Sequence, residues 1–266
     1  MTKFARMALA GTVVLAATTA AQAQKVPAHW VGLLDGNRIV HIDGRTAKVA
    51  KPVALTGIDG TVVGIDVRPA NGKLYALTLS GGLYTVDPKT GTATRASQLD
   101  KAVNTGLNPV VDFNPVADRL RVLGIDGASY RINVDSGQVA VDGSLKYDAG
   151  DAAAGKTPMV QAGAYSNSIA GTKETGLYDI DTTLGTFLVQ APPNDGVLKT
   201  RGSLGIKASA PLAFDIVTDG AGGNLGYLVA GKTLYTVDIA SGKATKKADL
   251  AGLRGALRDL AALPTM

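Results

Sequence analysis

The chain contains no cysteine and only two histidines, His29 and His41. Without cysteine, disulfide bonds and thiolate metal sites are excluded, so the fold must be held together by its hydrophobic core. Two histidines cannot form a three-histidine zinc site. A Ser-His-Asp triad would need one of them, and the sequence has no G-x-S-x-G motif. Zinc-dependent and serine-dependent hydrolysis are therefore disfavoured.

Charged and aromatic residues are also scarce, at 18% and 5% of the chain. The formal net charge of +5 comes from basic residues scattered along the sequence, whereas a nucleic-acid footprint needs a clustered stripe. Few aromatic rings remain for stacking on bases or sugars. No apolar run reaches the roughly 20 residues that a membrane-spanning helix needs. We therefore expect no nucleic-acid partner and no membrane span.

The N-terminal segment predicts export. Basic residues precede a short apolar run from Met7 to about Ala17, and small residues follow, ending in Ala21-Gln22-Ala23. This order is typical of a secretory signal peptide with its cleavage site. We expect residues 1–23 to be a signal peptide and residues 24–266 to form a single domain in the periplasm or outside the cell.

Glycine, by contrast, is abundant, with 33 copies, and a short motif recurs along the chain. Each copy alternates with the period of two expected of a strand and then enters a turn that begins with Asp or Asn. All but one of these turns end in Gly, which suits a left-handed backbone position, and the exception is Ala47. The five copies are Ile39–Asp43, Leu83–Asp87, Ser129–Asn133, Leu177–Asp181 and Leu234–Asp238.

A second, more apolar motif precedes most copies of the first. It is followed by a hairpin in three units, so that a complete unit has four antiparallel strands, as in a propeller blade. In this scheme the alternating motif is the third strand of each unit, and its face with Tyr84 and Val86 is buried. The apolar motif occupies residues 62–69, 109–115, 162–167 and 211–219.

The two ends of the chain explain each other. The first unit has no first strand of its own, since Trp30 to Leu34 resembles a second strand, whereas Ala256 to Leu263 resembles the missing first strand. We therefore predict an all-β fold, a five-bladed β-propeller of four-stranded antiparallel blades whose first blade is closed by the C-terminal strand. Closure removes exposed sheet edges. An open solenoid or a β-sandwich is the alternative, and Pro192 to Gly196 is interpreted as an inserted turn or extra hairpin in the fourth unit.

Aspartates recur at matching positions of the first strand in four units, and the fourth unit has Ala164 there. First strands line the channel of a propeller, so these carboxylates could converge, and a cation such as Ca²⁺ would relieve their repulsion. Alternatively, each carboxylate accepts hydrogen bonds from the backbone of a neighbouring blade and joins the blades. The four residues, candidate channel carboxylates and possible metal ligands, are Asp66, Asp112, Asp215 and Asp259.

A basic and acidic cluster is predicted near the blade edges, formed by Arg68, Asp118, Arg119 and Arg121. Arginine binds planar carboxylate or phosphate groups, so this cluster could take an anionic partner. Salt bridges between blades are the other interpretation.

The segment from Tyr147 to Lys156 is long for a connection between blades and carries Asp148 and Asp151. It lacks the residue order of a calcium-binding loop. Long loops on rigid scaffolds often bind ligands, so we take it as a candidate binding loop, with a simple inter-blade linker as the alternative.

Several stretches of the chain resemble a known bacterial family of exported proteins, "domain of unknown function 4394". The resemblance implies an exported, propeller-like protein, and it brings no established activity or catalytic residue. It is carried by Gly64 to Leu77, Gly81 to Thr94, Val111 to Leu123, Tyr147 to Val160, Ala164 to Ser168 and Pro192 to Gly205.

These observations favour a non-catalytic role. We expect an exported binding or scaffold protein, monomeric and without a cofactor, whose partner is a protein or a small molecule. The alternative is a metal-dependent hydrolase or lyase with a cation, such as Ca²⁺, held in the propeller channel by the four aspartates. That alternative rests on analogy with other propeller enzymes.

Overall fold

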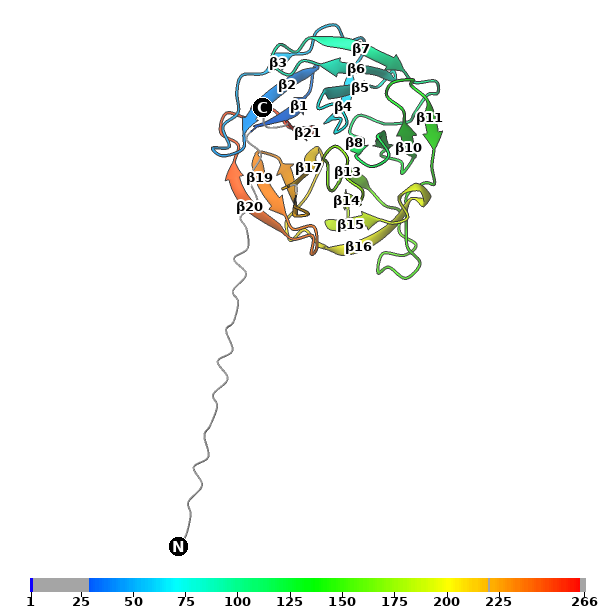
Figure 1. Ribbon diagram of the computed structural model, residues 1–266, viewed down its shortest axis with the longest axis vertical. Coiled ribbons are helices and arrows are strands. Elements are labelled where there is room, and N and C mark those ends of the chain that lie inside the picture. The colour runs from blue at the N-terminus through cyan, green and yellow to red at the C-terminus, as the bar shows by residue number, and fades with distance from the viewer. Residues whose placement is uncertain (2–28, 220, 264–266) are drawn as a thin grey trace.

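The computed structural model describes Met1 and residues 29–219 and 221–263, which form five β-sheets arranged as a ring (Figure 1). The predicted five-bladed, all-β propeller is therefore confirmed. The predicted signal peptide, residues 1–23, lies outside the described residues apart from Met1. No helix of the described chain is long and apolar enough to cross a membrane.

Each sheet is one blade, whose strands follow one another from the centre of the ring to its rim. Blade 1 consists of β21 (Asp259–Ala262), β1 (His29–Leu34), β2 (Arg38–Asp43) and β3 (Val53–Ala54). Blade 2 consists of β4 (Val62–Val67), β5 (Leu74–Thr78), β6 (Gly82–Val86) and β7 (Ala93–Gln98). Blade 3 consists of β8 (Val110–Asn114), β9 (Arg119–Leu123), β10 (Ser129–Ile132) and β11 (Val139–Val141). Blade 4 consists of β13 (Val160–Tyr165), β14 (Leu177–Asp181), β15 (Thr186–Gln190), β16 (Val197–Ser203) and β12 (Lys146–Tyr147). Blade 5 consists of β17 (Leu212–Thr218), β18 (Asn224–Ala230), β19 (Thr233–Val237) and β20 (Ala244–Asp249).

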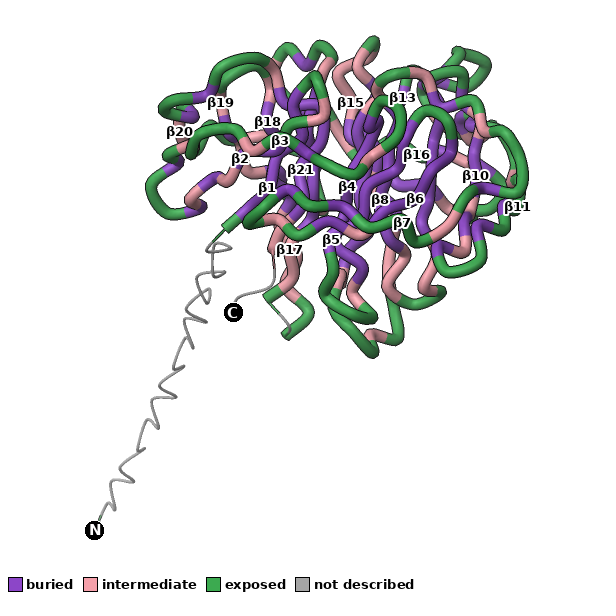
Figure 2. The backbone as a smooth tube through the Cα atoms, turned by 90° about the horizontal axis from the view of Figure 1, so that it is seen from above, coloured by how far each residue is buried: buried purple, intermediate pink, exposed green. Residues whose placement is uncertain are grey.

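The inner strands form a closed ring, in which β21 contacts β4, followed by β8, β13 and β17, and β17 contacts β21 again. These strands are buried at the centre of the molecule (Figure 2). Neighbouring inner strands run in the same direction: Gly64 lies against Val111, and Asp66 bonds Phe113 two residues further along both strands. The ring therefore has a leading end, where the inner strands begin, and a trailing end, where they finish.

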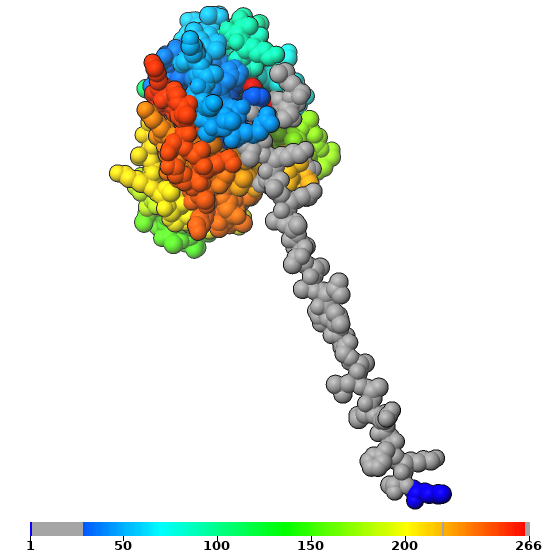
Figure 3. Space-filling view, turned by 90° about the vertical axis from the view of Figure 1, so that its left-hand side faces the viewer, coloured from blue at the N-terminus to red at the C-terminus, as the bar shows by residue number. Residues whose placement is uncertain are grey.

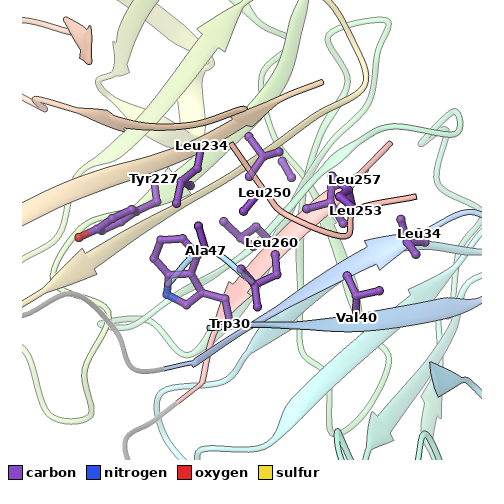
Figure 4. Close-up of a cluster of buried hydrophobic side chains, with 13 residues drawn as sticks. Trp30, Leu34, Val40, Ala47, Tyr227, Leu234, Leu250, Leu253, Leu257 and Leu260 are labelled. Atoms are coloured by element: carbon purple, nitrogen blue, oxygen red, sulfur yellow. The ribbon is translucent and has the colours of Figure 1, made fainter. Parts of the chain in front are cut away.

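The predicted closure by the C-terminal strand is also confirmed. β21 pairs with β1 in antiparallel register, with Ala262 opposite Trp30. Leu260 of β21 enters the hydrophobic cluster between blades 5 and 1, where the rings of Trp30 and Tyr227 meet edge to face with centroids 4.4 Å apart (Figure 4). The outer surfaces of these two blades lie side by side in Figure 3, blade 5 in orange and red and blade 1 in blue. The C-terminal strand thus contributes both hydrogen bonds and core packing.

The recurring turns form as predicted. In blade 2, Asp87 Oδ1 accepts hydrogen bonds from the N–H groups of Lys89 (2.8 Å) and Thr90 (3.4 Å). Gly91 closes that turn with a left-handed backbone (φ 74°), and Ala47 adopts the same conformation in blade 1 (φ 55°). The left-handed position is therefore kept even where the sequence lacks glycine.

Blade 4 departs from the predicted strand order. The motif Leu177–Asp181 forms β14, the second strand of the blade and not the third. The reason is that residues 166–176, between β13 and β14, form a loop where the other units have a strand. The segment Pro192–Gly196 is then the connection between β15 and β16, with a short 3-10 helix, η1 (Pro193–Asp195).

The changed strand order also reverses the side of the blade that the motif's tyrosine faces. Tyr84 on β6 packs towards the preceding blade, whereas Tyr178 and Ile180 on β14 pack towards the following one, blade 5. These faces do pack between blades, with Tyr178 only partly buried, and in blade 4 the motif meets the following blade where in blade 2 it meets the preceding one. The opposite face of β14, with Asp179, consequently faces blade 3.

The fifth strand of blade 4, β12, pairs in parallel with β16, and shorter parallel pairings of the same kind occur at other blades. Segments that lead from one blade to the next pair in parallel with the outer part of a neighbouring blade, so the blades are linked at the rim as well as at the centre. The parallel pairs are Lys48 with Ala251, Thr56 with Thr92, and Lys146–Tyr147 with Val197–Leu198.

Candidate functional site

The candidate channel carboxylates lie on inner strands, as predicted. Three of them occupy the same level of their blades, because each pairs with the corresponding residue of the second strand. The pairs are Asp66 with Tyr75, Asp112 with Arg121, and Asp215 with Tyr227.

Asp259 does not occupy the matching position. In blade 1 the third residue of the motif, His41, pairs with Val31, and Val31 pairs with Ala261. Ala261 therefore stands where blade 2 has Asp66, and Asp259 lies two residues earlier. The prediction of four equivalent positions is wrong for this residue, although its carboxylate makes the same kind of contact.

Each of the four carboxylates accepts a hydrogen bond from the main chain of the next inner strand. In the described part of the chain the junction from blade 4 to blade 5 has no such carboxylate, since β13 carries Ala164. The bonds are Phe113 N–H to Asp66 (2.7 Å), Tyr165 N–H to Asp112 (2.9 Å), Ala262 N–H to Asp215 (2.8 Å) and Ile65 N–H to Asp259 (2.8 Å).

The four carboxyl groups are all at most 8% exposed. Burial raises the pKa of Asp66 and of Asp112 well above the usual value, and repulsion from the other carboxylates adds to it. Burial raises the pKa of Asp259 in the same direction and that of Asp215 to about 6. The ring therefore keeps protons at a pH where exposed carboxyls have lost them.

The four inner-strand aspartates are not arranged as a set of metal ligands. Within residues 29–219 and 221–263, no group of three or more His, Asp or Glu side chains has the geometry to hold a metal ion. An oxygen of each inner-strand carboxylate already accepts a main-chain N–H. Ca²⁺ takes six to eight oxygen ligands at about 2.3–2.6 Å, so binding it would require these oxygens to regroup.

The predicted cluster of arginines and aspartates is divided between two blade junctions. The Arg68 guanidinium bonds Asp118 (2.5 Å) and Asp135 (2.7 Å), so it joins blade 2 to blade 3. Arg119 donates to the carbonyls of its own turn, at Ala117 and Asp118. The salt bridges from Arg68 thus match the inter-blade interpretation.

Arg121 is buried at the other junction, between blades 3 and 4. Its guanidinium bonds Asp142 (2.6 Å), the Tyr165 hydroxyl (3.2 Å) and the Asn194 side chain (2.9 Å). Asn194 belongs to the connection between β15 and β16, so the long insertion of the fourth unit completes this buried network.

The candidate binding loop lies at the rim of blade 4. Asp151 accepts hydrogen bonds from the Thr200 main-chain N–H (2.6 Å) and hydroxyl (3.0 Å) on β16. Asp148 Oδ2 is 3.7 Å from the Lys199 ammonium, and the Tyr147 hydroxyl donates to Asp181 (2.7 Å). These contacts hold the loop against the outer strand, as a linker between blades would be held, and its role in binding stays a prediction.

A groove of about 630 Å³ opens on blade 2 at the trailing end, beside Leu263. It is lined by the start of β5, the end of β6 and the turn and strand that follow, including Lys73, Asp87 and Thr94. Four threonines contribute to its wall, so it presents hydroxyl and methyl groups more than charge. No sequence pattern indicates this groove, because residues from three strands and the C-terminal segment meet there.

Arg258 is a further residue that the sequence reasoning missed. It lies directly ahead of β21 and is 8% exposed. Its Nε donates to Asn108 Oδ1 (3.1 Å) and its Nη1 to Asp35 Oδ1 (3.2 Å). The available signal was its place beside Asp259 in the strand that closes the ring.

The ring of blades closed by the C-terminal strand makes the protein a β-propeller. The chain belongs to the family described as "Domain of unknown function (DUF4394)", whose model matches residues 37–261. The resemblance predicted from the sequence is thereby confirmed. No curated protein matches the chain.

Among solved structures, the chain is similar to a structural genomics protein of unknown function from Bacteroides thetaiotaomicron VPI-5482, with 19% identity and a TM-score of 0.51 over 85% of this chain and 58% of that one. A structure titled "YCF48 bound to D1 peptide" matches with 14% identity and a TM-score of 0.41, over 82% of this chain and 62% of that one. The chain thus spans less than two thirds of both proteins. At such identity, the first match shows the fold alone.

Proposed function

We propose that this protein is an exported, non-catalytic binding protein that uses its propeller as a rigid scaffold. The observation that supports this most is the use of the inner-strand carboxylates. Each one bonds the main chain of the next blade, so the acidic series of the sequence serves to hold the ring together. Buried polar groups satisfied in this way stabilise one arrangement of the blades.

The competing function, metal-dependent hydrolysis or elimination in the channel, needs carboxylates that are free to ligate. Releasing them would break three buried hydrogen bonds and a part-buried one from Ala262, at a cost of about 1–3 kcal/mol for each buried N–H group left without an acceptor. Binding chemistry on the outer surfaces and ends makes no such demand, which is why the geometry supports it better.

Metal analysis and thermal melting of the mature chain, residues 24–266, test this proposal. We expect a metal-free protein whose melting temperature is the same in EDTA and in millimolar Ca²⁺. A melting temperature that rises with Ca²⁺, and no longer does so in Asp66→Asn, would overturn it in favour of a channel cation.

Export is tested separately by expressing the full chain with its native N-terminus. We expect the protein in the periplasmic or culture fraction, with the intact mass of a chain that begins at Gln24. A cytoplasmic protein that keeps Met1 would contradict export and leave the binding role to be tested on its own.

A further inference from the structure

Exposed apolar side chains gather at the leading end of the ring. Inner strands begin at this end, and second strands finish there because they are antiparallel to the inner ones. We call four side chains at this end the leading-end patch. They are Leu79 (46% exposed, between β5 and β6), Leu107 (54%, ahead of β8), Ile125 (41%, between β9 and β10) and Met159 (36%, ahead of β13).

The patch extends over three successive blades, 2 to 4. Its central members are neighbours, since a Cβ placed on Gly106 would come within 2.9 Å of the Ile125 side chain, and Leu107 is the next residue. Figure 2 shows exposed loops at both ends of the buried inner strands. Exposed apolar side chains on loops carried by a rigid ring are typical of a surface that binds another molecule.

Arg258 brings a positive charge to the same end. It lies ahead of β21 in blade 1, and Asn108, which its Nε contacts, lies ahead of β8 in blade 3. Although β4 stands between these two inner strands in the ring, the side chain links blade 1 to blade 3 and reaches the residue next to Leu107. A guanidinium therefore lies beside the leading-end patch.

The guanidinium is not fully used by the protein. Arg258 Nη2 is buried and has no hydrogen-bond partner among the described residues. Its contact with Asp35 involves Nη1 alone, and the Asp35 side chain is 77% exposed. Arginine binds carboxylates best through two parallel N–H···O bonds, so a carboxylate that replaces Asp35 can make a stronger contact than Asp35 does.

We propose that the leading end docks a peptide segment in which a carboxylate is flanked by apolar side chains. Arg258 receives the carboxylate, and Leu107, Ile125 and their neighbours hold the apolar side chains. This inference rests on the binding function proposed above and names the chemical class of its partner.

Selection of peptides on the immobilised mature chain tests the proposal, with a displayed library of random heptapeptides as the probe. We expect the selected sequences to contain Asp or Glu between apolar residues. The strongest peptide is then measured by calorimetry against variants of the chain. Sequences without a carboxylate, or a selection that yields no binder, would overturn the proposal.

The variants separate recognition from folding. Arg258→Met should weaken the peptide at least about tenfold, because the charge-assisted bonds are lost. Asp35→Asn should strengthen it several-fold, since it removes the competing carboxylate, an effect that a structural role for Arg258 would not produce. Equal binding to wild type and both variants would place the peptide elsewhere, leaving the binding function intact and this site overturned.

Apolar variants provide the second readout, which does not depend on Arg258→Met folding. Leu107→Ser and Ile125→Ser change exposed side chains and should each weaken the peptide about fivefold. Matched controls are Val116→Ser and Ile169→Ser, 47% and 42% exposed on loops at the trailing end. Loss of binding in the controls, with none in the leading-end variants, would contradict the proposal.

Discussion

Asp179 on β14 pairs with Gly163 on β13, and the two carboxylate oxygens of Asp179 have no hydrogen-bond partner among the described residues. Blade 5 has Leu228 paired with Phe214 at the same level. A Cβ on Gly163 would come within 2.4 Å of Asp179 Oδ1, so the glycine makes room for the carboxyl. Burial raises the pKa of Asp179 to about 8, and the positive charge of Arg121 opposes this only in part.

This buried carboxyl predicts how stability changes with pH. The folded pKa, about 8, lies above the unfolded value of about 4, so the folded state binds more protons between these values. The unfolding free energy that Asp179 contributes is therefore lost as the pH rises from about 4 to about 8. Asp179→Asn cannot ionise, and we expect its unfolding free energy to exceed that of wild type by at least about 2 kcal/mol at pH 9 and to agree within about 1 kcal/mol at pH 4. Urea unfolding at both pH values measures this.

The matched control is Asp59→Asn, which changes an exposed aspartate in the loop ahead of β4. It should follow wild type at both pH values, because the substitution changes a surface side chain and leaves the buried Asp179 in place. The other buried carboxyls contribute equally to all three proteins. A gain at pH 9 that is the same for both variants would show that Asp179 is not the group responsible.

The inner-strand carboxylates predict a difference between two substitutions of one residue. Asp66→Ala leaves the buried Phe113 N–H without its acceptor, which should cost about 1–3 kcal/mol. Asp66→Asn keeps an acceptor oxygen and removes repulsion from Asp215, so its cost should be less than half as large. Denaturant unfolding gives the free energies, and hydrogen exchange at the Phe113 amide should be faster in the alanine variant alone. Equal losses in both variants would mean that the inter-blade bond contributes nothing.

Much of the fold could be predicted because its signals are local. The turn that begins with Asp87 depends on residues only two or three positions away, and the alternation of each strand is visible in the letters. The strand order within blade 4 was predicted wrongly. Leu177–Asp181 forms a second strand, but it alternates in the same way as the copies that form third strands in the other blades. Strand order depended on residues 166–176, which form a loop and contain no repeated motif after Asn167.

The site was less predictable, since its contacts join separate blades. Repetition located Asp66 and Asp112, but their N–H partners depend on how neighbouring inner strands are aligned. Asp259 was assigned two residues away from its true register because short apolar stretches alternate alike in either register. Asp179 resembles an exposed polar position of a third strand, and it became buried only because β14 lies one strand further in.

Arg68 predicts a distinction between arginine and lysine at the junction of blades 2 and 3. Its fork bonds two carboxylates at once, on Asp118 and Asp135, and a lysine ammonium cannot reproduce that geometry. We expect Arg68→Lys to lower the unfolding free energy by about 1–2 kcal/mol. Asp135→Asn should cost no more than about 1 kcal/mol, because the Asp135 side chain is 66% exposed. Urea unfolding measures both, and a lysine variant as stable as wild type would contradict the assigned role.

Two turn glycines predict how the free space around a residue changes the cost of a glycine-to-alanine substitution when the backbone conformation is the same. Gly137 and Gly171 have nearly the same left-handed backbone, with φ of 76° and 77°. A Cβ on Gly137 would come within 1.9 Å of the Gln98 carbonyl oxygen of blade 2, whereas a Cβ on Gly171 would meet no atom of the described residues within 4 Å.

Both alanine substitutions carry the strain of a left-handed residue, about 1–2 kcal/mol, and Gly137→Ala must also push blades 2 and 3 apart. We therefore expect Gly137→Ala to lower the unfolding free energy by at least about 2 kcal/mol more than Gly171→Ala. Thermal and urea unfolding of the two variants measure the difference. Because backbone strain is matched, the difference reports the close approach of two blades at the rim. Equal destabilisation would mean that the rim yields to a methyl group, and that the blades are held together mainly by the inner strands.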